Sequence, residues 1–353
     1  MLRFPPVEFS LRPSLSSLSS SSSLFLSNSP NNFISPKIRI EGDFNFLGRT
    51  THHLSAMSAS INEHHGHPQD CSFRGGESFF MNILATMETV YLNRNPTAKA
   101  ILELVRSVDD DRLCYDHFAF RTYGVNGHGI DSMAKLFMDF GYVQREELRF
   151  PAKKLKAFWF APNVPHSDAG AGVNGPLRGY LYQNFSLIKC LQKLSALGCL
   201  TWEKPSYSEF QQLARESEYA AWTLVNGYML NHVTISAHRL KSHLRNIRNL
   251  NQFIEENGFK LNSEGGILKV SPDGLLLQSS TVADSTSFQF AEGIVESIPC
   301  SYIEFAERLV LPQFKNLPEN EVKEIHRRDG FEVGNADKIF ESTSMDQLTR
   351  KVA

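Results

Sequence analysis

Two histidines lie at matching positions in two similar stretches of the chain. The first stretch, YDHFAFR at residues 115–121, holds His117, and the second, LNHVTIS at residues 230–236, holds His232. In both, a polar residue precedes the histidine and bulky residues alternate after it, which is the period of a β-strand with one buried face. A single strand histidine is usually an ordinary core residue, but a matched pair in a repeat favours a metal site formed by both strands.

A third candidate ligand, Glu304, lies in the stretch CSYIEFAER at residues 300–308. If this stretch is a strand, Tyr302 and Glu304 share one face, and the carboxylate faces the same interior as the two histidines. Two histidines and one carboxylate on one side of a metal leave open positions, which is the ligand set of non-haem Fe(II) oxygenases. The alternative is a helix that begins near Glu304 and carries Glu307 and Arg308 on an exposed face.

Arg121 follows His117 by four residues, so on a strand both side chains point to the same face. A buried guanidinium needs an anion, because an unpaired buried charge is unfavourable. A structural carboxylate would serve, and so would the carboxylate of a substrate, which arginine binds through two parallel hydrogen bonds. Arg121 is therefore a candidate for substrate binding.

The elements around the histidines repeat in the same order. In each copy an amphipathic helix that ends at a glycine follows the histidine strand, and further strands follow the helix. The sequence therefore predicts an α+β fold, in which two duplicated βαβββ modules form a curled mixed sheet or barrel of eight strands with flanking helices. The predicted elements include helices at 79–90, 98–105, 131–140 and 240–256, and strands at 115–121, 142–150, 155–160, 230–236, 259–261, 267–270 and 275–280.

The first 40 residues differ in composition from the rest of the chain. They are rich in serine and hold four basic residues and one acidic residue. This composition is typical of an organelle transit peptide, plastid rather than mitochondrial because serine outnumbers arginine. We expect the protein in the plastid, in the stroma of the chloroplast or amyloplast. The predicted organisation is a transit peptide or disordered segment at 1–55, a linker at 56–76 and a catalytic domain at 77–353, with module one at about 112–200 and module two at about 225–312.

Charge and apolar patterning argue against several classes of partner. The formal net charge is −2, from 36 basic and 38 acidic residues, so bulk charge indicates no nucleic acid and no anionic membrane surface. No run of 18 apolar residues occurs, which argues against a membrane span. The five cysteines form no C-x-x-C pair, so neither a disulfide framework nor a zinc ribbon is indicated. The expected partners are small molecules, and the oligomeric state stays open.

Four stretches resemble the motifs of one known family, the 2-oxoadipate dioxygenase/decarboxylases, also called hydroxyglutarate synthases. They are DHFAFRTYG (116–124), VNGYMLNHVTIS (225–236), SYIEFAERLVLP (301–312) and GFEVGNADKIFEST (330–343). The resemblance extends from about Glu77 to the C-terminus and is strong toward plant plastid members. It implies a vicinal-oxygen-chelate core with Fe(2+) as cofactor, and conversion of a 2-oxo dicarboxylic acid, 2-oxoadipate, and O2 to 2-hydroxyglutarate and CO2 in lysine degradation. The plant members are linked to starch accumulation in plastids.

The resemblance also implies roles for individual residues. Arg121 corresponds to the arginine that binds the substrate carboxylate, and a C-terminal loop, here within 313–353, orients the substrate in the family. Val333 is the matching residue of that loop, and Gly334 stands where some bacterial members have serine. The residues that correspond to the metal ligands are His117, His232 and Glu304.

One segment, residues 177–195, departs from the family pattern. LRGYLYQNFSLIKC (177–190) stands where the family has a strand that reads roughly RVFISE, followed by LVD. Codons can be chosen for this run whose neighbouring frame reads VFISEFLVDQM. We therefore predict a local frameshift, from a gene-model error or a variant transcript, that affects the closing strand of module one. A transcript that encodes this sequence without interruption would contradict the prediction.

Two other functions remain open at this point. One is a different chelate-fold dioxygenase or isomerase, although Arg121 favours an acidic substrate over a catechol. The other is a non-catalytic plastid interaction protein, if the 177–195 segment is truly disrupted. Stoichiometric iron and O2 uptake that depends on 2-oxoadipate would distinguish the enzyme from the interaction protein.

Overall fold

The computed structural model describes residues 71–109, 113–123, 130–162, 178–181, 200 and 202–345. The predicted transit peptide at 1–55 and most of the predicted linker at 56–76 lie outside these residues. Two helices, α1 (Cys71–Arg94) and α2 (Pro96–Asp109), precede the first strand. Among the helices of the described part, none has the length and apolar character that a membrane span requires.

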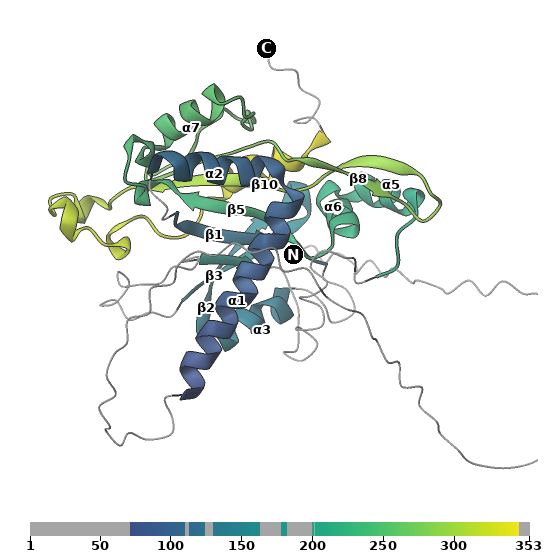
Figure 1. Cartoon of the computed structure of the whole chain (residues 1–353), viewed down its shortest axis with the longest axis horizontal. Coiled ribbons are helices and arrows are strands. Elements are labelled where there is room, and N and C mark those ends of the chain that lie inside the picture. The colour runs from purple at the N-terminus through teal and green to yellow at the C-terminus, as the bar shows by residue number, and fades with distance from the viewer. Residues whose placement is uncertain are drawn as a thin grey trace, which may run out of the picture. The chain divides into compact units, whose positions relative to one another are not determined.

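Eight strands form one mixed sheet, and their order confirms the predicted duplication. The order is β2-β3-β4-β1-β5-β10-β7-β6, so each module contributes four adjacent strands and the two histidine strands, β1 and β5, pair at the centre. In each module the first strand pairs parallel with the last, β1 with β4 and β5 with β10. Figure 1 shows β10, β5, β1, β3 and β2 following one another across the sheet. The strands are β1 (Tyr115–Phe120), β2 (Tyr142–Phe150), β3 (Leu155–Pro162), β4 (Arg178–Leu181), β5 (Leu230–Ser236), β6 (Lys269–Val270), β7 (Leu276–Ser280) and β10 (Tyr302–Arg308).

The register of the three central strands determines which side chains lie together. His117 on β1 pairs with Thr234 on β5, and Glu304 on β10 pairs with the same Thr234 from the other side. Tyr302 pairs with His232 in the same way. Residues that are paired across a sheet point to the same face. The register therefore places His117, His232 and Glu304 on one face of the sheet.

The sheet curls until its two edge strands approach the same helix. Helix α8 (Val333–Ile339) contacts β2, at one edge of the sheet, and also β6 and β7, at the other. The edge strands β2 and β6 are not hydrogen-bonded neighbours in the sheet order, so this helix lies between them. The architecture is a curled open sheet rather than a fully hydrogen-bonded barrel.

The opposite face of the sheet carries the main hydrophobic core. Helices α1, α2, α3 (Ile130–Asp139) and α7 (Ile247–Glu256) contribute apolar side chains to it, and Figure 1 shows α1 crossing the strands and α2 running along them. On β10, Ile303 and Phe305 are fully buried in this core, and Glu304 between them points to the other side. Full burial of an aliphatic or aromatic side chain contributes roughly 1.5–3 kcal/mol. The strand therefore holds the carboxylate in place through the core packing of its neighbours.

The structure corrects two predicted elements of module two. The helix predicted at 240–256 begins only at Ile247, because the Asn246 side chain accepts hydrogen bonds from the first backbone N–H groups and caps α7. Two short 3-10 segments, Ala237–Arg239 and His243–Arg245, precede it. The strand predicted at 259–261 is wrong, since only Leu261 forms a bridge, with Thr281.

Two helices and a hairpin extend module two beyond the repeat. Between β7 and β10 the chain forms the hairpin of β8 (Ser285–Gln289) and β9 (Val295–Pro299). It packs against α5 (Tyr207–Glu216) and α6 (Glu218–Asn226) through a small apolar cluster. Figure 1 shows the hairpin and these helices together at one end of the sheet. The repeat pattern did not predict this addition.

The segment predicted to be frameshifted is described only in part. Residues 178–181 form β4, which lies between β1 and β3. Its place in module one corresponds to that of β10 in module two. Residues 182–199 lie outside the described part, so the frameshift stays a prediction.

Candidate metal centre

Three ligand atoms from three adjacent strands converge at the centre of the sheet. The Glu304 Oε2 atom lies 3.1 Å from His232 Nε2 and 3.8 Å from His117 Nε2. The two Nε2 atoms lie 3.4 Å apart. All three side chains are buried, and their ligand atoms lie within 4.8 Å of one another. The structure thus brings together the three residues that the sequence predicted as ligands, and the alternative of a helix at Glu304 is wrong.

The residue before each histidine determines which nitrogen faces the centre. His117 Nδ1 lies 2.9 Å from the Asp116 carboxylate, and His232 Nδ1 lies 3.0 Å from the Asn231 side-chain oxygen. Both oxygens accept hydrogen bonds, so each imidazole carries its proton on Nδ1 and presents the lone pair of Nε2. Sequence reasoning noted a polar residue at these two positions but assigned it no role.

Further side chains form hydrogen bonds with Glu304 and His117. Gln278 donates to Glu304 Oε1 at 2.7 Å, and Asn335 from α8 donates to the Gln278 oxygen at 3.1 Å. The Thr234 hydroxyl lies 3.0 Å from His117 Nε2. Glu304 therefore keeps Oε2 for the centre while Oε1 is hydrogen-bonded. Gln278 and Asn335 were not predicted, because their contacts join segments that are far apart in the sequence.

Burial and mutual charge set the protonation of the ligands. Burial lowers the pKa of His232 to about 4, although the neighbouring Glu304 acts in the opposite direction. Burial alone would raise the pKa of Glu304, but His117 and His232 outweigh it and hold this pKa below its ordinary value. Near neutral pH the centre therefore offers an uncharged His232 and a charged Glu304.

This arrangement fits a divalent metal ion. With the protons on Nδ1, two imidazole lone pairs and one carboxylate oxygen face one another at short distances in a buried site. A divalent cation is the partner that neutralises such a set, and transition metals prefer imidazole and carboxylate donors. Three ligands from one side leave further coordination positions for small molecules.

Arg121 lies just beyond the end of β1 and is enclosed by aromatic rings. Its guanidinium carbon lies 4.9 Å from the ring centres of both Tyr219 and Trp222 on α6. It also donates to the Thr343 hydroxyl at 3.1 Å. The side chain is buried, and its charge is close enough to His232 to contribute to the lowered pKa of that residue. The substrate role of Arg121 stays a prediction.

Val333 is the first residue of α8 and has an exposed fraction of 38%. The structure places its neighbours at the centre instead. The ring of Phe331 packs edge-on against His117, with 5.0 Å between the ring centres, and Asn335 reaches Gln278. The segment predicted to orient substrate therefore does approach the metal centre, while a substrate contact of Val333 itself stays a prediction.

The lowered pKa of His232 predicts a pH dependence of stability for the metal-free protein. An unfolded histidine takes up its proton near pH 6.5, and folded His232 does so only at about 4. Between these values the unfolded state binds more protons, so the contribution of His232 to stability rises with pH through this window and is constant above it. The difference corresponds to roughly 3 kcal/mol. Urea unfolding with a chelator present should show this slope for wild type and a smaller slope for His232→Gln. Equal slopes would contradict the assignment.

Comparison with known proteins identifies relatives across most of the chain. A model of the 2-oxoadipate dioxygenase/decarboxylase family matches residues 83–170 and 193–321. The chloroplastic 2-oxoadipate dioxygenase/decarboxylase of Arabidopsis thaliana is 65% identical in an alignment of 297 residues that covers 78% of this chain and 80% of the relative. The chloroplastic/amyloplastic enzyme of the same name from Oryza sativa subsp. japonica is 64% identical in an alignment of 307 residues that covers 81% of this chain and 84% of the relative.

A solved structure supports the same relationship. The crystal structure of the hydroxyglutarate synthase from Oryza sativa in complex with 2-oxoadipate has a TM-score of 0.72 and 62% identity, and covers 84% of this chain and 100% of that chain. The family match omits residues 171–192, which overlap the segment at 177–195 that departs from the family pattern. The matches on both sides of this gap include all three ligands and Arg121. The chain therefore belongs to the 2-oxoadipate dioxygenase/decarboxylase family.

Proposed function

We propose that this protein is an Fe(II)-dependent enzyme that converts 2-oxoadipate and O2 to 2-hydroxyglutarate and CO2. The observation that carries the proposal is the buried set of His117, His232 and Glu304 in a member of this family. The rice structure that resembles the chain at 62% identity contains 2-oxoadipate, the proposed substrate. The relatives from Arabidopsis thaliana and rice carry the name of this activity.

The ligand set supports iron among the possible metals. Two histidines and one carboxylate on one side of the ion are characteristic of non-haem Fe(II) oxygenases. When bound, iron(II) would hold the 2-oxo acid and O2 next to each other and activate the oxygen. The chain itself contributes the orientation of the ligands, through Asp116, Asn231 and Gln278, and the exclusion of bulk water from a buried centre.

The proposed reaction balances without a second organic substrate. The carbon–carbon bond between the carboxylate and the keto carbon breaks, and CO2 leaves. One oxygen atom of O2 enters the carboxylate that forms at the former keto carbon, and the other enters the new hydroxyl group. The acid that is decarboxylated and the acid that is hydroxylated are thus the same molecule, which must remain in place between the two steps. A buried site in which a fixed cationic side chain binds the substrate carboxylate is suited to that requirement.

Arg121 is the candidate partner for the distal carboxylate of the substrate. It lies on the continuation of β1 beyond His117, and the rings of Tyr219 and Trp222 fix the plane of its guanidinium. A guanidinium binds a carboxylate through two parallel hydrogen bonds. A fixed guanidinium at one end and a metal at the other would select acids by their length.

Direct loading tests the activity. Anaerobic addition of Fe(II) to wild type, followed by 2-oxoadipate and O2, should give stoichiometric iron, O2 uptake, 2-hydroxyglutarate and CO2. Glu304→Gln should lose tight iron binding and all turnover above background, because it removes the charged ligand. Glu307→Gln is a matched control on the opposite face of the same strand, where Glu307 accepts a hydrogen bond from the Ile247 N–H. An iron-free wild type with a stable fold would contradict the proposal.

Replacement of Arg121 tests substrate recognition. Arg121→Ala should lower kcat/KM for 2-oxoadipate by roughly 30-fold or more, since truncation of one partner of a buried charge pair typically costs at least about 2 kcal/mol. Turnover of a 2-oxo monocarboxylic acid of equal length should change much less. Arg149→Ala, at an exposed arginine on β2, serves as the control. Unchanged kcat/KM for 2-oxoadipate in Arg121→Ala would exclude the assigned role.

We also propose that the protein acts in the plastid, as the names of its two curated relatives indicate for those proteins. The serine-rich, basic first 55 residues supply the expected import signal, and a role in lysine degradation and starch accumulation would follow from the family resemblance. A fluorescent protein fused behind residues 1–55 should enter plastids. Cytosolic fluorescence would contradict the prediction.

The alternative is a non-catalytic plastid protein of the same fold. The observation in its favour is that the family match omits residues 171–192, a range that includes β4, the strand that pairs with β1. The iron and O2 measurements above distinguish the two functions, because only the enzyme requires a stoichiometric metal.

A further inference from the structure

We propose that the buried Asp116–Arg308 ion pair positions His117 for metal binding and connects the metal centre to residues 328–331, which we call the closing segment. This inference rests on the metal site of the proposed function. It assigns to Asp116 and Arg308 the role of positioning residues, since neither is one of the three ligands.

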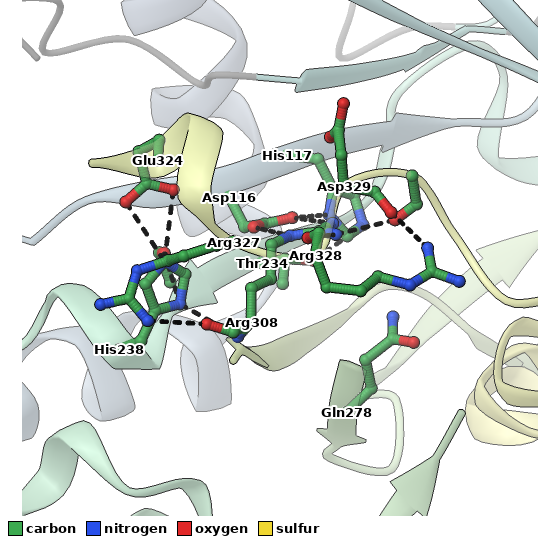
Figure 2. Close-up of polar contacts among 12 residues, drawn as sticks. Asp116, His117, Thr234, His238, Gln278, Arg308, Glu324, Arg327, Arg328 and Asp329 are labelled. Atoms are coloured by element: carbon green, nitrogen blue, oxygen red, sulfur yellow. Dashed lines mark hydrogen bonds and ion pairs between the residues drawn. The ribbon is translucent and has the colours of Figure 1, made fainter. Parts of the chain in front are cut away.

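Two hydrogen bonds join the side chains of Asp116 and Arg308. Arg308 Nε lies 2.7 Å from Asp116 Oδ1, and Arg308 Nη2 lies 2.9 Å from Asp116 Oδ2. The same Oδ2 accepts the Nδ1–H of His117 at 2.9 Å. Asp116 and Arg308 have exposed fractions of 1% and 0%. Figure 2 shows the Arg308 side chain reaching Asp116.

The sheet register explains how these residues meet. Strand β5 lies between β1 and β10, but it ends at Ser236, which pairs with Ala306. Arg308 is two residues further along β10 and lies beyond the end of β5. Its side chain points to the same face of β10 as that of Glu304, and on this face its guanidinium reaches Asp116 on β1. One strand thus supplies both a metal ligand, Glu304, and the partner that holds another ligand in place.

The two histidine ligands differ in this respect, although the modules are related by duplication. His232 donates to the neutral side chain of Asn231, whereas His117 donates to a carboxylate that is held by a guanidinium. A buried ion pair contributes little net stability compared with apolar packing, so stability alone gives a weak reason for it. A carboxylate behind a ligand histidine fixes the ring and makes its metal-binding nitrogen more basic.

Arg308 also holds the closing segment. Its Nη1 donates to the Gly330 carbonyl at 2.7 Å and to the Arg328 carbonyl at 3.2 Å, and Figure 2 shows Arg328 beside it. Its guanidinium lies 5.2 Å from the ring centre of Phe331, the residue that packs against His117. Gly330 has φ +70°, a conformation that favours glycine. The closing segment therefore contacts the metal ligand both directly and through Arg308.

These contacts predict mutual reinforcement. A cation on His117 Nε2 draws electron density from the ring and strengthens the hydrogen bond from Nδ1–H to Asp116. Asp116 then holds Arg308 in the rotamer that binds the Gly330 carbonyl. Because coupling between two equilibria is reciprocal, metal binding should order the closing segment, and an ordered closing segment should tighten metal binding.

Three variants test the inference in the full chain with Co(II) as a redox-stable probe. Asp116→Asn keeps an acceptor for His117 but loses the negative charge. Arg308→Lys keeps the positive charge but loses the paired hydrogen bonds of the guanidinium to Asp116. Both should weaken Co(II) binding by about 10- to 100-fold. Asp109→Asn is the control, because Asp109 is a buried carboxylate that accepts hydrogen bonds from the backbone N–H groups of Lys241 and Ser242. Its Co(II) affinity should equal that of wild type.

Two readouts separate positioning from general stability. In Co(II)-loaded wild type, proton NMR should show two shifted, exchangeable Nδ1–H signals, one for each histidine. Asp116→Asn should move one signal or speed its exchange with solvent, and leave the other unchanged. Hydrogen exchange at residues 328–331 should slow on Co(II) binding in wild type and in Asp109→Asn, but not in Arg308→Lys. If Asp116→Asn does not fold, Arg308→Lys carries both the affinity and the exchange measurement.

The possible failures are distinguishable. If wild type and Glu304→Gln bind Co(II) equally weakly, the metal site itself is wrong and the proposed function fails with it. If wild type binds one Co(II) tightly and both positioning variants bind it equally tightly, only the present inference is overturned. Metal-independent exchange of the closing segment in wild type would likewise overturn the coupling.

Discussion

Burial of charged and polar groups at the centre of one sheet is the constraint on which the rest of the structure depends. A buried carboxylate, a second buried carboxylate and two imidazoles lie on three adjacent strands, and each must find a partner because water does not reach them. These partners surround the two histidines and Glu304. Asp116, Asn231 and Gln278 form hydrogen bonds with the ligand-residue atoms that face away from the centre. The two imidazole nitrogens and the carboxylate oxygen that remain form a compact set of donors that suits a divalent ion.

The duplication explains both the symmetry and the asymmetry of this centre. Related strands, β1 and β5, pair at the junction of the modules and bring two equivalent histidines together. The last strand of each module, β4 or β10, lies next to one of them. In module two that strand carries Glu304 and Arg308, so a single strand contributes a candidate ligand and the guanidinium that pairs with Asp116, the partner of His117. A pseudo-symmetric sheet thereby produces a site whose two halves differ chemically.

The C-terminal part of the chain completes the site from outside the repeat. Helix α8 lies between the edge strands of the curled sheet, and residues before and after it contact His117 and Arg121. Phe331 packs on His117, and Thr343 accepts a hydrogen bond from Arg121. The same segment therefore lies beside the metal ligands and beside the candidate substrate arginine.

Much of the site could be predicted from the sequence because it depends on local patterns. The alternation around His117 and His232 determined two strands, and the alternation around Glu304 determined a third. An alternation of apolar and polar residues along the sequence is sufficient to indicate a strand with one buried face. The family motifs added the assignment of ligands. The start of α7 was misplaced because the capping side chain of Asn246 outweighed helical periodicity that extended further back.

The sequence by itself therefore determined the repeat, the three candidate ligands and the family. Only the tertiary structure decided the pairs that join distant segments. Arg308 meets Asp116 across 192 positions of the chain, and it does so because the sheet order brings β1 and β10 to either side of β5. Asn335 meets Gln278 because the sheet curls around α8. Such contacts follow from strand register and sheet curvature, which are properties of the whole fold, and no local pattern of residues encodes them.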